Sequence, residues 1–319
     1  MSDKHVFDTL IVTTPDDFRR VSIHLPRISA NITNGRLIFI GRSEVGSLMR
    51  ENLDSSKFSF INENEIIPFD DVHALFCKRL ESIAQGQEIP RRLTGWYYQQ
   101  FLKMKYAYIC DNEYYMTWDG DTIPCKKVEM FDSITDQPYF DLKHEHHKPY
   151  FETLSVILPG MSKIIEQSFI SEHMIFKCEF MKELVDAIEG NTNIEGTLFW
   201  EKILNAIPPE DIQNSAFSEF ETYGTFVSLR HVNFYKPHEW HSFRYGASFF
   251  DPKKISDSDY EWLSKDFGAI TFEKNQTVRE DHKNLFDNKE YQSKLSARQM
   301  LEIAQEDFEG DSYIEKWGE

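Results

Sequence analysis

Two aspartates, Asp119 and Asp121, flank Gly120 directly after the apolar and aromatic run YYMTW. Carboxylates at this spacing can both turn toward one cation, and the glycine keeps the turn compact. Mg²⁺ or Mn²⁺ held in this way retains waters and takes diphosphate oxygens as further ligands. An acidic turn also occurs without any metal, so a structural turn is the alternative. The buried-strand pattern before the pair and the sequence TIP after it favour the metal site.

A second group of candidates lies in the stretch LRHVNFYKPHEWHSFRYG, which concentrates histidines and cations. Imidazole is a suitable ligand for Mn²⁺, and a lysine can offset charge on a leaving diphosphate. His231 is the preferred ligand because it follows a strand-like run, within the alternating stretch 223–235 that predicts a strand, and Lys236 is the candidate cation. The alternative is that these histidines are solvated loop residues.

Glu219 and Glu221 alternate with aromatic residues in AFSEFETYG. Glycosyl transfer with inversion needs a carboxylate that removes the proton of the acceptor hydroxyl. A carboxylate flanked by phenylalanines is partly desolvated, which raises its pKa and makes it a better base near neutral pH. A turn with solvated carboxylates is the alternative, and the sequence does not separate the two glutamates.

The elements that must position these residues alternate between strand and helix. Apolar runs at 7–14, 35–43, 58–62 and 113–118 predict strands, with helical spacing between them at 16–29, 70–84 and 94–110. Such an alternation predicts parallel βαβ units in an α/β fold. Ligands of open α/β sheets bind beyond the carboxyl ends of the strands, where Asp119 and Asp121 fall. Thr13 and Thr14 after the first strand, and Arg42 after the second, are expected to hold the nucleotide base and ribose.

A strand ending in YYMTWDGDTIP, preceded by a βαβ unit and an aromatic, glutamine-rich helix, resembles the glycosyltransferases with the GT-A architecture. The similarity covers about residues 6–245 and is greatest to bacterial enzymes of surface polysaccharide synthesis. It implies a Rossmann-type mixed sheet flanked by helices. It also implies a divalent ion held by the two aspartates on the diphosphate of a nucleotide sugar, with Asp119 also contacting the donor.

The same resemblance implies further contacts. In these enzymes the helix before the DxD strand can touch the donor, so Lys103 is assigned to the diphosphate and Gln100 to the donor. Some retaining members carry a histidine followed by Lys-Pro; His231 and Lys236-Pro237 are similar, although the spacing is one residue shorter and the usual glycine is absent. The candidate base favours inversion and the Lys-Pro similarity favours retention, so the stereochemistry stays open.

Composition limits the partners and the location of the protein. The 319 residues carry a net charge of −18, from 35 Lys and Arg against 53 Asp and Glu, which argues against nucleic-acid binding. The four separated cysteines form no disulfide scaffold, and neither a signal-peptide pattern nor a long apolar segment is present. We therefore expect a cytoplasmic protein that is not integral to the membrane. Peripheral contact with the inner face of the membrane is compatible with this expectation.

The domain expected from these patterns spans residues 1–278, with a nucleotide-binding half at 1–125 and an acceptor half at 126–278. Residues 279–319 form a charged helical extension that could contact a second copy of the chain or a partner enzyme. The expected substrates are a nucleotide-sugar donor and a saccharide or lipid-linked saccharide acceptor. Two alternatives remain, a metal-dependent phosphoester or nucleotide-sugar hydrolase and a non-catalytic saccharide-binding protein.

Overall fold

The computed structural model describes residues 5–32, 35–53, 57–84, 86, 88–144, 146–274 and 285–304. Its centre is a five-stranded sheet with the strand order β3-β2-β1-β4-β7. The strands in this order are Phe58–Asn62, Leu37–Gly41, Phe7–Val12, Tyr114–Trp118 and His173–Lys177. The first four are parallel and β7 is antiparallel to β4. The predicted α/β fold with a mixed sheet is thus confirmed.

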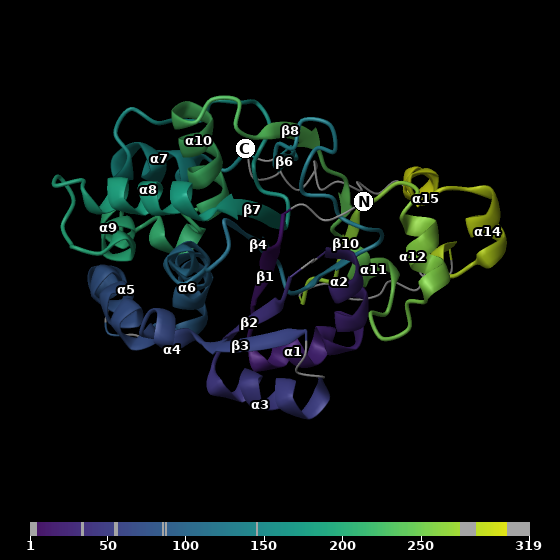
Figure 1. Cartoon of the computed structure of the whole chain (residues 1–319). Coiled ribbons are helices and arrows are strands. Elements are labelled where there is room, and N and C mark those ends of the chain that lie inside the picture. The colour runs from purple at the N-terminus through teal and green to yellow at the C-terminus, as the bar shows by residue number, and fades with distance from the viewer. Residues whose placement is uncertain are drawn as a thin grey trace.

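The helices of the N-terminal half cover both faces of this sheet (Figure 1). Helix α3 contacts β2, β3 and helix α1, whereas α6 contacts β1 from the other face. Right-handed crossovers explain the arrangement, because the chain moves outward from β1 to β3 and then returns past β1 to β4. The helices are α1 (Pro15–Val21), α2 (Leu25–Ile32), α3 (Ser43–Asn52), α4 (Glu63–Ile66), α5 (Phe69–Ala84) and α6 (Arg91–Lys105), with the short 3-10 helices η1 (Ser22–His24) and η2 (Tyr106–Tyr108).

The reversal of chain direction creates a switch point between β1 and β4, where open α/β sheets bind their ligands. Asp119 and Asp121 follow β4 at this point, and Thr13 follows β1. The two loops approach closely at Gly120: a Cβ added there would lie 3.1 Å from Ile11 Cγ2 and 3.8 Å from Thr13 Oγ1. A small residue between the aspartates therefore lets the two loop ends meet.

The C-terminal half adds two small sheets and a helical layer beside β7 (Figure 1). One small sheet has the order β5-β10-β9 and the other pairs β6 with β8. The strands are β5 (Thr122–Pro124), β6 (Tyr139–Leu142), β8 (Lys236–Glu239), β9 (Ser242–Phe243) and β10 (Ala269–Thr271). The helices are α7 (Lys148–Ile157), α8 (Cys178–Glu189), α9 (Phe199–Ala206), η3 (Ile212–Asn214) and α10 (Glu219–Arg230).

Helix α10 corrects the prediction of a strand over 223–235. Ser218 begins the helix, because its hydroxyl accepts a hydrogen bond from Glu221 N at 3.3 Å. Every residue from Glu219 to Val227 is buried. A helix buried on all sides has no polar face, so its sequence lacks the period that distinguishes a surface helix from a strand.

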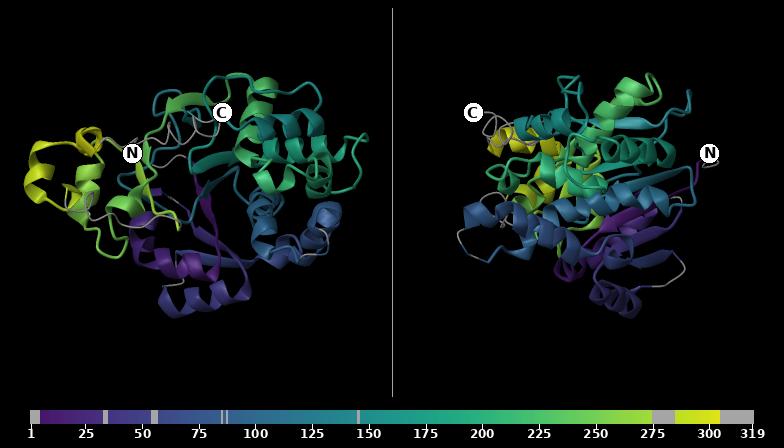
Figure 2. Two further views of the ribbon diagram at one scale, coloured as in Figure 1. Left: turned by 180° about the vertical axis from the view of Figure 1, so that it is seen from behind. Right: turned by 90° about the vertical axis from the view of Figure 1, so that its left-hand side faces the viewer.

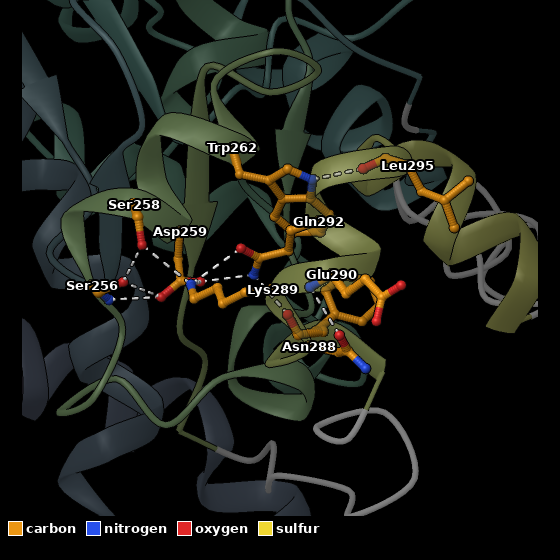
Figure 3. A network of polar contacts seen from close by, with 10 residues as sticks. Ser256, Ser258, Asp259, Trp262, Asn288, Lys289, Glu290, Gln292 and Leu295 are labelled. Atoms are coloured by element: carbon orange, nitrogen blue, oxygen red, sulfur yellow. Dashed lines mark hydrogen bonds and ion pairs between the residues drawn. The ribbon is translucent and has the colours of Figure 1, made fainter.

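The last described helices pack on the core at the edge of the molecule (Figures 1 and 2). They are α11 (Gly246–Phe249), α12 (Asp257–Leu263), α14 (Lys289–Lys294) and α15 (Ala297–Ala304). Phe286 is fully buried against Phe249 and Trp262. Asp259 of α12 accepts hydrogen bonds from Lys289 at 2.5 Å and from Gln292 at 2.8 Å (Figure 3).

The predicted domain boundary at 278 lies outside the described residues, as does the end of the predicted extension, 305–319. Within the described part, residues 285–304 contribute to the core through Phe286. None of the helices in the described ranges combines the length and the apolar character that crossing a membrane requires.

Candidate active site

Lys103 joins two residues that are far apart in the sequence, Asp119 and Glu219. From the last turn of α6, its Nζ lies 3.0 Å from Asp119 Oδ1 and 2.9 Å from Glu219 Oε1. The side chains of Lys103 and Glu219 are 6% and 5% exposed, whereas that of Asp119 is 38% exposed. The fold thus brings a buried ion pair to the switch point, and the cluster reaches solvent through Asp119.

Burial and charge act in opposite directions on this pair. Burial would lower the pKa of Lys103, but the carboxylates of Asp119 and Glu219 raise it above its ordinary value. Burial raises the pKa of Glu219, and the attraction of Lys103 offsets only part of that effect. Lys103 therefore stays charged, while Glu219 takes up a proton more readily than an exposed glutamate.

Asp121 is the second aspartate of the turn and lies half-buried beside β10. Burial and then the negative charge of Asp119 raise the pKa of Asp121 to about 7, although Arg20 partly offsets them. Phe272 N donates to the main-chain oxygen of Asp121 at 2.8 Å, and Arg20 Nη1 donates to Phe272 O at 2.5 Å. These contacts fix the loop in which the two carboxylates repel one another.

This pair of carboxylates fits a hard divalent cation, because such an ion prefers oxygen ligands and would relieve their repulsion. Within the described ranges, the structure contains no cluster of three His, Cys, Asp or Glu side chains able to hold a metal. An ion at Asp119 and Asp121 would take its other ligands from water or from a substrate. That donor set is the kind with which Mg²⁺ or Mn²⁺ binds a diphosphate.

Gln100 positions the N-terminus of α10. Its Oε1 accepts a hydrogen bond from Glu219 N at 2.9 Å, and its Nε2 donates to Trp96 O at 3.2 Å. Both ends of the buried amide are thus used within the protein.

Glu221 is also buried, but it accepts a hydrogen bond from Ser168 Oγ at 2.6 Å. Residues two apart on a helix do not share a face, which explains why only Glu219 meets Lys103.

The three residues predicted for the nucleotide lie at the same edge of the sheet as Asp119. Thr13 is buried at the end of β1 beside Gly120. Thr14 is the N-cap of α1, where its hydroxyl donates to Asp17 Oδ2 at 2.7 Å and accepts from Asp17 N at 3.2 Å. Arg42 follows β2 and is exposed.

The structure does not bring His231 or Lys236 to the aspartates. His231 follows the far end of α10, about 18 Å along the helix from Glu219. It contacts Glu183 Oε2 at 2.6 Å. Lys236 Nζ binds Asp132 Oδ2 at 2.5 Å. Lys236 pairs with Tyr139 at the first end of the β6–β8 ladder, whereas Lys143, the partner of Glu172, follows the other end. The run that predicted a strand before His231 is a helix, and its length carries the histidine away.

A second buried pair, Lys143 and Glu172, lies on the other side of the Asp119 turn. Asp119 N donates to the main-chain oxygen of Glu172 at 2.8 Å, and Glu172 adopts a left-handed φ of 63°. Its carboxylate accepts from Lys143 at 2.8 Å, Ser242 at 3.0 Å and Trp240 at 3.1 Å. Burial would raise the pKa of Glu172, but Lys143 and then other cations lower it to about 2.

Sequence reasoning did not select Lys143 or Arg244 for the site. Arg244 Nε lies 3.7 Å from Glu172 Oε1, and its Nη2 lies 3.7 Å from Glu273 Oε1. Arg244 belongs to the basic stretch noted in the sequence, whereas Lys143 lies outside the motifs selected there. Arg244 follows β9, which pairs with β10, whereas Lys143 follows β6, which pairs with β8.

Residues 11–299 match the model of a protein family described as "Family of unknown function (DUF6492)". The chain belongs to this family. No curated protein matches its sequence significantly.

Solved structures that resemble the chain include mouse xyloside xylosyltransferase 1 in its apo form, with 13% identity, a TM-score of 0.42 and coverage of 86% of this chain and 99% of the other. The galactosyltransferase LgtC in complex with donor and acceptor sugar analogs has 11% identity and a TM-score of 0.42, covering 91% and 96%. The mannosyltransferase Ktr4p from S. cerevisiae in complex with GDP has 11% identity and a TM-score of 0.40, covering 68% of each chain.

These three solved structures are glycosyltransferases, the class that the sequence resembles. At such low identity the likeness concerns the fold alone. An activity has to be inferred from the side chains of this chain and their surroundings.

Proposed function

We propose that this protein is a glycosyltransferase that moves a sugar from a nucleotide-diphosphate donor to a saccharide or glycolipid acceptor. The observation that carries the proposal is the Lys103 cluster: a lysine holds Asp119 and Glu219 together at the switch point of the sheet. A half-exposed carboxylate pair suited to a cation thus lies next to a buried carboxylate suited to proton transfer.

Asp119 and Asp121 would hold Mn²⁺ or Mg²⁺, and their close carboxylates support this assignment. The ion would neutralise charge on the donor diphosphate as the sugar leaves. Lys103 supplies a fixed positive charge beside the same aspartate. Thr13 and Arg42 would contact the nucleotide from the neighbouring strand ends, where a ligand of an open α/β sheet binds.

Glu219 would accept the proton of the acceptor hydroxyl. Its raised pKa supports this role, because a base is most effective when its pKa lies near the working pH. Gln100 would act by positioning Glu219 rather than by touching the donor. Glu221 is a weaker candidate because Ser168 occupies it on another face of α10. A general base favours inversion, and product stereochemistry tests this directly.

The acceptor class and location follow from the resemblance noted in the sequence. We propose a saccharide or lipid-linked saccharide of bacterial surface polysaccharide synthesis, modified on the cytoplasmic side of the membrane.

Thermal unfolding with a panel of nucleoside diphosphates and Mn²⁺ tests the donor site. A nucleotide at about 100 times its dissociation constant should stabilise the folded state by about 2.7 kcal/mol. The variant Asp119→Asn/Asp121→Asn should lose the stabilisation, whereas Asp70→Asn/Asp71→Asn, an exposed acidic pair on α5, should keep it. Stabilisation that is independent of Mn²⁺, or that survives the first variant, would contradict the proposal.

Incubation with nucleotide sugars and Mn²⁺, with and without saccharide acceptors, separates the alternatives. A transferase should release nucleotide mainly when an acceptor is present. Release that is fast and independent of acceptor would favour a hydrolase. Saccharide binding without any nucleotide turnover would favour a non-catalytic binding protein.

A further inference from the structure

Glu172 holds its main chain in a conformation that its residue type disfavours. Its φ of 63° is left-handed, a region that residues other than Gly, Asn and Asp adopt rarely. The other non-glycine residues of the described chain with such a φ are Asp136, Ser215 and Asn233, and none of these three is buried. Glu172, in contrast, is 5% exposed. Backbone strain at a buried position persists only where the surrounding contacts over-determine it, and such strain clusters at functional sites.

The main chain of Glu172 carries the start of the acidic turn. Its oxygen accepts a hydrogen bond from Asp119 N at 2.8 Å, one position beyond the register pair of Trp118 and His173. The ladder between β4 and β7 thus ends in this contact. Relaxation of Glu172 to an extended conformation would change both φ and ψ, so its side chain and its carbonyl could not both keep their directions. The side chain of Glu172 therefore controls a hydrogen bond to Asp119.

The carboxylate of Glu172 is anchored to the small sheet that carries the other aspartate. It accepts a hydrogen bond from the hydroxyl of Ser242, the first residue of β9, at 3.0 Å. Strand β9 pairs with β10, and Phe272, directly after β10, donates its N–H to the main-chain oxygen of Asp121 at 2.8 Å. One side chain thus ties the main chain of Asp119 to the sheet that holds Asp121.

Two further donors prevent this carboxylate from turning. Lys143 Nζ donates to Glu172 Oε1 at 2.8 Å and to Ser242 Oγ at 2.8 Å. Trp240 Nε1 donates to the other carboxylate oxygen, Oε2, at 3.1 Å. Both oxygens are therefore occupied by donors from other elements. These contacts supply the over-determination that a left-handed glutamate requires.

We propose that Glu172 is a positioning residue of the metal site, which sets the relative placement of the Asp119 and Asp121 carboxylates without touching the ion. Two carboxylates that repel one another stay close only if the main chain on both sides is fixed. Mg²⁺ in addition demands near-ideal ligand geometry. Groups that orient the ligands of a metal typically change its affinity by about 10- to 100-fold when they are replaced. This inference rests on the proposed function, which places the ion at the two aspartates.

Titration with Mn²⁺, followed by electron paramagnetic resonance of the free ion, tests this role without any turnover. Glu172→Gln should raise the dissociation constant of Mn²⁺ about tenfold or more, because an amide cannot accept from every donor that faces the carboxylate. Asp259→Asn is the matched control. Asp259 is also a buried carboxylate, which accepts from Lys289 and Ser256 at 2.5 Å each (Figure 3). Its replacement should leave the dissociation constant of Mn²⁺ unchanged.

The double variant Lys143→Met/Glu172→Gln separates positioning from stability. It buries no unpaired charge, so it should unfold at a higher urea concentration than Lys143→Met. Its Mn²⁺ dissociation constant should stay raised, because the anchor of the Asp119 turn is still missing. Recovery of wild-type Mn²⁺ affinity together with stability would overturn the inference. If Glu172→Gln fails to fold, Trp240→Phe/Ser242→Ala removes two donors and keeps the charge pair. That variant should weaken Mn²⁺ binding about threefold, and wild-type affinity in it would overturn the inference as well.

The wild type and the aspartate variant distinguish failure of this inference from failure of the proposed function. Mn²⁺ binding that is lost in Asp119→Asn/Asp121→Asn but unchanged in a folded Glu172→Gln would overturn the positioning role and leave the proposed function standing. A wild type that binds no Mn²⁺, or an aspartate variant that binds it equally well, would refute the metal site and the positioning role together.

Discussion

The two lysine–glutamate pairs that flank Asp119 consist of the same residue types, but their surroundings differ. Glu172 and Lys143 are both 6% exposed, and Ser242 and Trp240 also donate to the Glu172 carboxylate. Glu219 and Lys103 are equally buried, but Lys103 divides its charge between Glu219 and the 38% exposed Asp119. The first pair is closed and the second is open to solvent.

This difference reverses the balance between burial and attraction. For Glu172 the cations outweigh burial and its pKa falls to about 2, whereas for Glu219 burial outweighs Lys103 and its pKa rises. A carboxylate with several donors is fixed in its charged form and serves the fold. A carboxylate with one shared cation can exchange a proton, which is what a general base requires.

The largest expected effect on stability comes from removing the lysine of the closed pair. Lys143→Met leaves the charge of Glu172 buried without its main cation, so we expect unfolding free energy to fall by about 3–5 kcal/mol. Urea unfolding followed by circular dichroism measures the change. The double variant Lys143→Met/Glu172→Gln should recover much of the loss. Equal loss in both variants would show that Lys143 acts through packing rather than charge.

Removing the lysine of the open pair should lower the unfolding free energy less than removing Lys143. In Lys103→Met, Glu219 can become protonated because its pKa is already raised, so we expect a loss of about 1–3 kcal/mol. Lys105→Met, a half-buried lysine two positions along the same helix, is the control and should change stability little. Urea midpoints compare the two. A loss as large as that of Lys143→Met would remove the proposed distinction between the pairs.

Acid titration of stability sharpens the same comparison. The folded-state pKa of Glu172 lies below its ordinary value, so its contribution is present above about pH 4.5 and is lost as the pH falls toward 2. The contribution should decline by about 1.4 kcal/mol per pH unit in that window. Urea midpoints of wild type and Glu172→Gln should therefore approach one another as the pH falls from about 4.5 toward 2. Parallel curves would contradict the assignment.

The smallest expected effect concerns a third buried carboxylate, Asp141, which contacts His173 Nε2 at 2.7 Å and also pairs with His238. The hydrogen bond to Asp141 raises the pKa of His238. The stabilising contribution of charged His238 is therefore present below about pH 6.5, and it is lost as the pH rises through the raised pKa of this histidine. Because His238 is half-exposed, His238→Gln should lower the thermal midpoint only slightly, at pH 6 and not at pH 9. Equal midpoint losses at both values would exclude a charged His238.

Part of the candidate site could be predicted from local sequence. The run YYMTW followed by Asp119, Gly120 and Asp121 indicates a buried strand that ends in a compact acidic turn, and β4 ends there. Lys103 and Gln100 could be selected because they lie on the helix before that strand. Local patterns succeed for these residues because strand, turn and helix each leave their own spacing in the chain.

Other parts could not be predicted in this way. Helix α10 is buried along its first nine residues, so its sequence alternates as a strand would and led to the selection of His231. Lys143 follows the short strand β6 and meets both Glu172, before β7, and Ser242 of β9, which lies 99 positions farther along the chain. Contacts at such separations leave no period in the sequence.

Local spacing along the chain is enough to predict the α/β alternation, the acidic turn after a buried strand and the residue types from which a base could come. The packing of distant elements, in contrast, joins Lys103 to both Asp119 and Glu219 and places His231 and Lys236 elsewhere. Periodicity reports which face of an element is buried, whereas the partner of a buried charge depends on how distant elements pack.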